Sequence, residues 1–282
     1  MSELRAAEQN QPNNRELRMG TIYRYARPEL PEHRELDAMP NFYWHTFTDG
    51  MPKAKLERGI SRLPCVQGDE GERVPAFLLR STPWKAGSEA TPWHDSFDRA
   101  SGTVTYFGDN RLDPATGEPK HAEPGKSLGN SQLETATFEH QSNDDVRRDN
   151  GGPILLFTGV PHAGRQKGNV RFDGLGVLTR VEIVNHDAHW SGSEFRNFKF
   201  EVQLLDLEAD DWTVRWEWIA RRRSAEASPN EIRPLAPTVW KRWCKEGHDA
   251  LPELKLRRFL VEPLSLPRPP EGSAATDRTA QL

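Results

Sequence analysis

The chain has 282 residues, of which 35% are hydrophobic and 28% charged, and its formal net charge at pH 7 is −4. No run approaches the roughly 18 apolar residues that a membrane-spanning helix needs. The polar N-terminus also lacks the apolar core of a secretion signal. We therefore expect a cytoplasmic protein with room for one large domain or two small ones and without a membrane partner.

The cysteines and the distribution of charge limit which kinds of site the protein can contain. The two cysteines, Cys65 and Cys244, lie far apart and form no Cys-x-x-Cys pair, so we expect free thiols and no structural zinc. The slight acidity counts against nucleic-acid binding only weakly, because a nucleic acid responds to the local field rather than to net charge. Basic residues are concentrated at 221–223 and 241–242.

Most apolar runs have the alternation of strands, and helices are fewer. Gly174 and Gly176 mark bends or bulges in the long apolar run at 170–184. Gly129-Asn130 indicates a tight turn before the run at 132–138. Many strands joined by long loops favour a curved sheet or barrel. We expect strands at 76–82, 103–110, 132–138, 154–158, 170–184, 195–207 and 213–219, and helices at 51–59, 237–246 and 252–261.

These elements predict an α+β protein that is mainly β, with four segments. Residues 1–19 have no periodicity and are predicted to be disordered. A β-rich domain is expected over 20–225, and a helical extension over 226–265. The proline-rich end, 266–282, is predicted to be a flexible tail.

Two aromatic residues beside an acid are the most informative pattern. Trp93 and Asp95 lie in a loop between two expected strands, and Tyr106-Phe107-Gly108 ends the second strand. Aromatic faces can stack on a planar ring, and a carboxylate can accept a hydrogen bond from an exocyclic amine. The pattern predicts a pocket for a flipped base, with cytosine favoured for its N4 amine.

A packing role competes with this interpretation. A single tryptophan is more often a core residue than a ligand-binding one, and Asp95 alone could cap a turn. The combination with the strand end at Tyr106 favours the pocket. Trp84 competes with Trp93 for the stacking position, and the sequence leaves that choice open.

Polar and basic loops supply candidate contacts to DNA. Asn110 and Arg111 open a long loop that could fill the space of a flipped base, and the glycine-rich loop 162–169 could meet the backbone. Solvated loops and surface ion pairs are equally compatible with these residues. The candidate DNA contacts are Asn110, Arg111, Lys120, Lys126, Asn130, Arg165, Lys167, Arg221 and Arg222.

No enzymatic centre is evident. The histidines are scattered, and there is no zinc-hydrolase, HNH-type or Gly-x-Ser-x-Gly pattern. The nearest imitation of a metal-dependent nuclease is Asp173 with Glu201-Val202-Gln203, in which a glutamine stands where the nuclease pattern requires lysine. The alternative is a hidden catalytic centre around Asp173, Glu182 and Glu201. We therefore expect no catalytic residue, no metal and no cofactor.

The order of these motifs resembles the SRA (SET- and RING-associated) domain. The matching features are the strand end at Tyr106, the Gly129-Asn130 turn, the strand at 154–157 and Phe172-Asp173-Gly174-Leu175-Gly176-Val177. The sequence is most similar to the N-terminal halves of modification-dependent restriction endonucleases of the MspJI and AspBHI kind, over roughly residues 20–225. Phe107 departs from the family pattern, which has threonine there.

The resemblance implies a β-barrel that holds 5-methylcytosine between two aromatic rings. Carried over by position, Tyr106 and Trp93 would stack on the base, and Asp95 would accept a hydrogen bond from its N4 amine. The loop from Asn110 would fill the space that the flipped base leaves in the duplex. The expected partner is double-stranded DNA containing 5-methylcytosine in a bacterial restriction system, possibly with a separate nuclease, near the nucleoid. The alternatives are a modification-dependent endonuclease with a cryptic metal site and an RNA-binding barrel.

Overall fold

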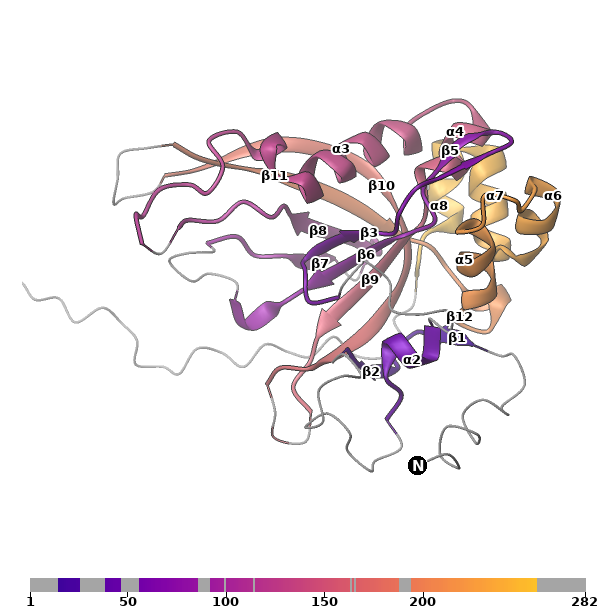
Figure 1. Ribbon diagram of the computed structural model, residues 1–282, viewed down its shortest axis with the longest axis horizontal. Coiled ribbons are helices and arrows are strands. Elements are labelled where there is room, and N and C mark those ends of the chain that lie inside the picture. Colours follow the sequence, from indigo (N-terminus) through magenta and orange to yellow (C-terminus); the bar gives the residue numbers. More distant parts are fainter. Residues whose placement is uncertain are drawn as a thin grey trace, which may run out of the picture.

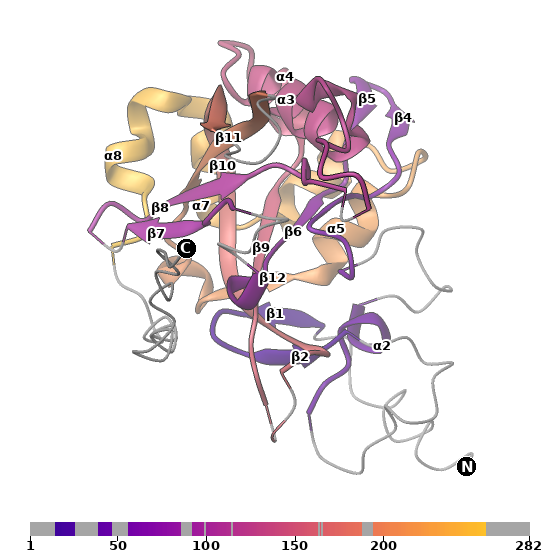
Figure 2. The same cartoon turned by 90° about the vertical axis from the view of Figure 1, so that its left-hand side faces the viewer.

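The computed structural model describes residues 15–25, 39–46, 56–85, 92–98, 100–113, 115–162, 164, 166–187 and 194–257. This part of the chain is a mixed α+β fold with more strand than helix. Helices α3 and α4 lie on one side of a large sheet, and β1 and α2 lie on the other (Figures 1 and 2). No helix within these ranges is long and apolar enough to cross a membrane.

An eight-stranded mixed sheet forms the centre of the fold. Strands β6 and β9 run parallel, and the other neighbours are antiparallel. In spatial order the strands are β3 (Ile60–Arg62), β6 (Phe77–Ser81), β9 (Ile154–Gly159), β10 (Asn169–Asp187), β11 (Glu194–Leu204), β8 (Thr103–Phe107) and β7 (Ser96–Asp98), and β2 (Ile22–Arg24) pairs with β10.

The sheet is open, so the expected closed barrel is wrong for the described residues. Its outer strands, β3 and β7, share no backbone ladder. Side chains nevertheless connect the two halves, because the Tyr106 hydroxyl of β8 donates to the Arg80 carbonyl of β6 at 3.4 Å. The curvature that the sequence predicts is therefore present, but side chains rather than a strand ladder close it.

The predicted central strands are confirmed. Every residue of β9 is buried, which explains its uninterrupted apolar run. The register of β10 against β9 shifts between Phe172 and Gly174, and Gly174 has a φ of +142°. Glycine adopts this conformation without a Cβ clash, so the bulge that the sequence predicts lies at Gly174.

Two predicted strands are helices instead. Residues 132–138 belong to α3 (Leu128–His140), in which Leu133, Ala136, Thr137 and His140 are buried. That spacing is helical, and the apparent alternation over seven residues concealed it. Gly129 and Asn130 consequently lie in the first turn of α3 and not in a tight turn.

The second error concerns residues 213–219. Only β12 (Thr213–Arg215) is a strand, and α5 (Trp216–Arg222) follows directly. Trp216, Ile219 and Arg222 are buried at i, i+3 and i+6, whereas the spacing of the tryptophans imitates a strand. The basic run at 221–223 therefore ends a helix.

The remaining elements are short. The helix predicted at 237–246 is confirmed as α7 (Thr238–Glu246), and part of 252–261 is α8 (Leu251–Leu254). Residues 56–59 form a turn and a bend, and 51–55 and 258–261 lie outside the described residues. The others are α2 (Phe42–Thr46), α4 (Asp145–Gly151), α6 (Pro229–Ile232), β4 (Val66–Gly68), β5 (Gly71–Arg73), and the 3-10 turns Pro83–Lys85, Pro124–Lys126, Glu208–Asp210, Arg233–Leu235 and His248–Ala250.

At the N-terminal end, β1 (Glu16–Arg18) pairs with β12. The prediction of disorder is therefore wrong for residues 15–19. Residues 1–14 and the predicted tail at 266–282 lie outside the described residues. Both cysteines are free thiols, as predicted.

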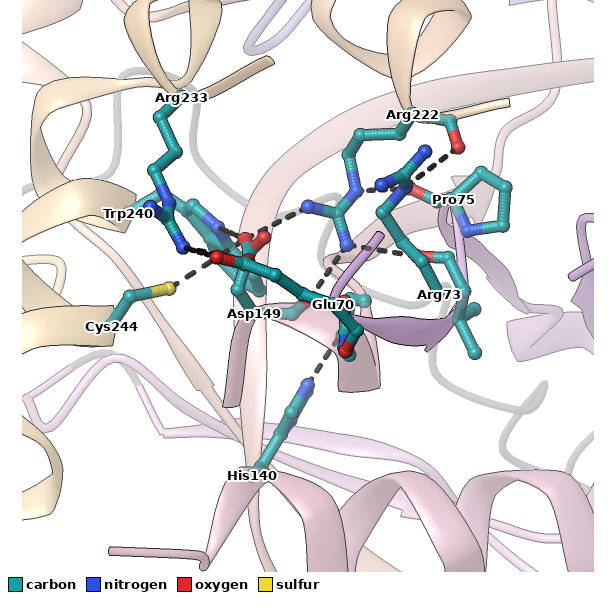
Figure 3. Close-up of polar contacts among 12 residues, drawn as sticks. Glu70, Arg73, Pro75, His140, Asp149, Arg222, Arg233, Trp240 and Cys244 are labelled. Atoms are coloured by element: carbon teal, nitrogen blue, oxygen red, sulfur yellow. Dashed lines mark hydrogen bonds and ion pairs between the residues drawn. The ribbon is translucent and has the colours of Figure 1, made fainter. Parts of the chain in front are cut away.

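Helices α5 and α7 dock on the sheet through a buried polar network around Asp149 of α4 (Figure 3). Its Oδ1 accepts hydrogen bonds from Arg222 Nη1 and Trp240 Nε1, both at 2.8 Å. Arg222 is fully buried and also donates to the carbonyls of Val74, Pro75 and Asp149. Because each donor has an acceptor, this network joins the helices to the sheet without an unpaired buried charge.

Candidate nucleic-acid interface

A pocket of about 490 Å³ opens where the ends of β6 and β8 face each other. The segment after β8 lies at the opposite end of the sheet from the C-terminal helices (Figure 1). Sequence analysis predicted many of the residues that line this pocket, from three separate stretches of chain. These are Trp93, Asp95, Tyr106, Phe107, Gly108, Asn110, Arg111 and Lys120.

Asp95 lies in the loop that enters β7 and faces the pocket. Its Oδ1 accepts the backbone N–H of Phe107 at 2.9 Å, and the Ser81 side chain is also hydrogen-bonded to it. Burial raises the pKa of Asp95 to about 6, the two hydrogen bonds oppose this rise, and the charge of Asp109 adds to it. Asp95 is thus a carboxyl group that hydrogen bonds hold in place and that has a pKa of about 6.

Tyr106 forms a buried wall of the pocket. Its ring is 3% exposed, and its hydroxyl is held by the Arg80 carbonyl. Burial, followed by the charges of Asp95 and Asp109, raises the pKa of Tyr106 well above its usual value. The side chain therefore stays neutral and presents an uncharged aromatic surface to a ligand.

Trp93 also lines the pocket but belongs to a small aromatic cluster. It stacks on Phe107 with ring centroids 5.4 Å apart and an interplanar angle of 21°. Phe195 and His186 of the β10–β11 hairpin pack against it at 5.1 and 5.5 Å. In this conformation Phe107, rather than a ligand, occupies one face of the Trp93 ring.

Trp84, the alternative stacking residue, does not belong to the pocket lining. Its ring lies so close to Gly159 that a Cβ there would come within 2.5 Å of it. The space over Gly159 therefore accommodates Trp84, which packs against the sheet.

Three cations line the pocket without forming an ion pair to any described residue: Arg58, Arg111 and Lys120. A hydrogen bond from the backbone N–H of Lys120 to the Arg111 carbonyl, at 2.9 Å, holds two of them side by side. Lys85 also lines the pocket, and its pKa is lowered by burial and then by the charges of Arg80, Lys167 and Arg111. This local excess of positive charge suits an anionic ligand, although the whole chain is acidic.

Sequence analysis missed Asp109, a second carboxylate in the pocket. A Cβ built on Gly59 would lie 2.8 Å from Asp109 Oδ1 and 3.1 Å from the Tyr106 hydroxyl, so these groups are close together. Loss of solvent raises the pKa of Asp109, whereas Arg111, Lys120, Arg58 and Arg80 lower it. Its position directly after the predicted Tyr106-Phe107-Gly108 strand end was the available signal.

Two asparagines predicted as DNA contacts are buried instead. Asn110 Nδ2 donates to the carbonyls of His121 and Arg196, at 2.9 and 2.7 Å. Asn130 Oδ1 accepts the Asp109 N–H at 2.7 Å, and its Nδ2 donates to the Pro124 carbonyl at 3.0 Å. Both side chains hold the loop that follows β8, so Asn110 is not placed to enter a duplex in this structure.

The other predicted basic contacts are dispersed. Lys126 and Lys167 are exposed but are not part of the pocket lining, and Arg165 lies outside the described residues. Arg221 is exposed on α5. Arg222 is fully buried beside Asp149, so its prediction as a DNA contact is wrong.

The three acids of the nuclease alternative do not form a metal site. Asp173 is buried and paired with Arg171 at 2.6 Å, and Glu182 pairs with Lys199 at 2.6 Å. Glu201 accepts the Thr179 hydroxyl at 2.7 Å. Within the described ranges, no group of three histidine, cysteine or acidic residues is arranged to hold a metal ion.

Comparison with protein families places this geometry in context. Residues 69–253 match the family described as Restriction endonuclease AspBHI N-terminal, which confirms the resemblance to proteins of that kind. The match crosses the boundary that the sequence predicts at residue 225. Among curated protein sequences, none matches this chain.

Solved structures similar to this chain include two restriction-endonuclease structures. One is the MspJI restriction endonuclease in complex with a 27-mer oligonucleotide, with 32% identity and a TM-score of 0.75. The likeness covers 96% of this chain, which spans 61% of the MspJI chain. The other is the DNA recognition domain of the cytosine modification-dependent restriction endonuclease LpnPI, with 19% identity, a TM-score of 0.53, and coverage of 82% of this chain and 88% of that one, which shows a shared fold.

Proposed function

Because residues 69–253 match it, the chain belongs to the family of restriction endonuclease AspBHI N-terminal domains, and on this premise we propose that it recognises DNA containing 5-methylcytosine. The modified base would leave the duplex and enter the pocket between β6 and β8. There Asp95 would bond the N4 amine, and Tyr106 would contact the face of the ring.

The observation that carries this proposal is the combination of groups in one pocket. A fixed carboxyl group and a neutral aromatic wall suit a base. The cations Arg58, Arg111 and Lys120, which form no ion pair with a described residue, suit the adjoining phosphates. Base–aromatic stacking contributes about 1–3 kcal/mol and can offset an unstacking cost of a few kcal/mol. A methyl group in an apolar niche adds on the order of 1 kcal/mol, so we expect modest discrimination.

The likeness to MspJI, a restriction endonuclease bound to an oligonucleotide, supports DNA as the partner. It extends over 61% of that chain, and the matching family is an N-terminal region. We accordingly propose that these 282 residues act as a recognition module and that a nuclease outside them cuts the DNA.

The test is a gel-shift titration at fixed salt of one duplex, unmodified or carrying 5-methylcytosine. Asp95→Ala removes a hydrogen bond to a charged or polar partner, worth about 1.5–3 kcal/mol, so the affinity for methylated DNA should fall roughly ten- to hundred-fold. Asp98→Ala, a neighbouring exposed acid on β7, is the matched control and should bind as wild type does. Equal binding of both duplexes by wild type would refute the proposal, and tighter binding of a structured RNA competitor would favour the RNA-binding alternative.

A further inference from the structure

A flipped cytosine presents two kinds of hydrogen-bonding group side by side. Its N4 amine is a donor, and the adjacent ring nitrogen N3 is an acceptor. An ionised carboxylate can only accept, whereas a neutral carboxylic acid accepts at one oxygen and donates from the other. Of the two protonation states of the aspartate, only the neutral acid satisfies both of these atoms of an uncharged base.

The surroundings of Asp95 distinguish its two oxygens. Oδ1 accepts the Phe107 N–H at 2.9 Å, so it is the carbonyl-type oxygen of a neutral acid, and Oδ2 is the oxygen able to carry a proton. The Ser81 side chain is also hydrogen-bonded to Asp95. A hydroxyl group donates or accepts according to its rotation, so Ser81 is compatible with either protonation state.

The pocket around Asp95 contains charged groups of both signs. Asp109 is a second carboxylate in the same pocket, and its side chain has no hydrogen bond or ion pair to a described residue. Burial and this charge hold the pKa of Asp95 at about 6, so protonation at neutral pH costs on the order of 1 kcal/mol. The titratable and charged groups facing the pocket with Asp95 are Glu57, Arg58, Arg80, Lys85, Tyr106, Asp109, Arg111, Lys120 and His121.

We propose that Asp95 reads the flipped base as a neutral carboxylic acid and takes up one proton as the base enters. Oδ1 then accepts a hydrogen from the N4 amine, and the Oδ2 hydroxyl donates to N3. The proton comes from solvent and returns to it when the base leaves, so no bond of the base changes. This inference rests on the proposed function and specifies the chemistry of the same site.

The two protonation states predict opposite behaviour for Asp95→Asn. An asparagine amide accepts at its oxygen and donates from its nitrogen, which reproduces the neutral acid. If the neutral acid binds the base, the variant should retain affinity and lose its pH dependence. If an ionised carboxylate binds the base, the variant should weaken binding at every pH.

The experiment is a fluorescence-anisotropy titration of the methylated duplex at constant ionic strength from pH 5.5 to 8.5. Wild-type affinity should weaken by up to about tenfold per pH unit above pH 6, as the uptake of one proton requires. Asp95→Asn should show a flat profile and bind more tightly than wild type at pH 8.5. Asp98→Asn, the same substitution at the exposed acid on β7 outside the pocket lining, is the matched control and should keep the wild-type slope.

Two outcomes would overturn proton uptake while leaving the proposed function intact. One is a wild-type profile that stays flat while the methylated duplex is still preferred. The other is a folded Asp95→Asn protein, checked by circular dichroism, whose affinity is reduced at all pH values. Absence of any preference for the methylated duplex from pH 5.5 to 8.5 would instead remove the proposed function itself.

Discussion

At the end of the sheet that the C-terminal helices cover, every charge of the central cluster has a partner. Asp149 accepts from both Arg222 and Trp240, and Arg222 in turn donates to three backbone carbonyls (Figure 3). Arg73 adds a hydrogen bond to the Arg222 carbonyl at 3.1 Å. His140 lies nearby with both ring nitrogens engaged, one with the Gly152 carbonyl and the other with the Leu178 N–H.

At the pocket end, charges are left without partners in the described part of the chain. Arg58, Arg111 and Lys120 form no ion pair, and Asp109 lies among them without accepting a hydrogen bond on its carboxylate. Matched buried charges hold a fold together, because each desolvated group recovers its hydrogen bonds. Unmatched charges around a pocket can instead be matched by a ligand. The two ends of the sheet therefore differ as a structural cluster differs from the proposed binding site.

The largest expected effect comes from breaking the matched cluster. Arg222→Met leaves the partly buried Asp149 without its cation and the carbonyls of Val74 and Pro75 without their donor, so the free energy of unfolding should fall by about 3–5 kcal/mol. Urea unfolding monitored by tryptophan fluorescence measures this. Arg221→Met, on the exposed neighbour, is the control and should change stability by less than about 0.5 kcal/mol. A similar small change in both variants would contradict the structural role.

A fall in pH should change the free energy of unfolding in opposite directions through the two ends of the sheet. Burial lowers the pKa of His140 to about 3, so the unfolded chain binds a proton that the folded chain does not. Stability present above pH 6.5 is then lost as pH falls, by about 2 kcal/mol at pH 5 from this residue alone. The raised pKa of Asp95 acts in the opposite sense, because the folded state protonates first as pH falls through about 6.

The variant Asp95→Asn allows the contribution of Asp95 to the pH dependence of stability to be measured. It removes the partial compensation, so the loss of stability between pH 7.5 and pH 5 should exceed that of wild type by about 1 kcal/mol. Urea unfolding at both pH values gives the four free energies required. An equal loss in wild type and variant would mean that Asp95 titrates as an ordinary exposed carboxyl group.

The smallest expected effect is that of single cations at the pocket. Arg111→Gln and Lys120→Gln should each weaken binding of methylated and unmethylated duplex alike and reduce the slope of log K against log salt by about 1. Lys241→Gln, an exposed lysine on α7, is the matched control and should leave the slope unchanged. Unchanged slopes for the two pocket variants would show that these cations meet no phosphate.

Part of this picture was predictable from local patterns. The apolar run of β9, the glycine bulge at Gly174 and helix α7 follow from composition and periodicity, because burial on both faces, positive φ and capping are local requirements. The helices α3 and α5 were missed, since short stretches of alternating residues fit periods of 2 and 3.6 alike. Tertiary packing of His140 and Arg222 decided in favour of the helix.

For the candidate site, the sequence by itself determined the residue types and the strand ends that carry them: Asp95 in its loop, and Tyr106 at the end of β8. Only the tertiary structure decided which side chains face the hollow, because the curvature of the sheet brings β6 and β8 together across the three strands that lie between them in its order, β9, β10 and β11. It turned Asn110 and Arg222 inward, where buried carbonyls required donors, and brought Asp109 beside Tyr106. Burial and hydrogen-bond satisfaction are properties of the whole fold, and local sequence does not specify them.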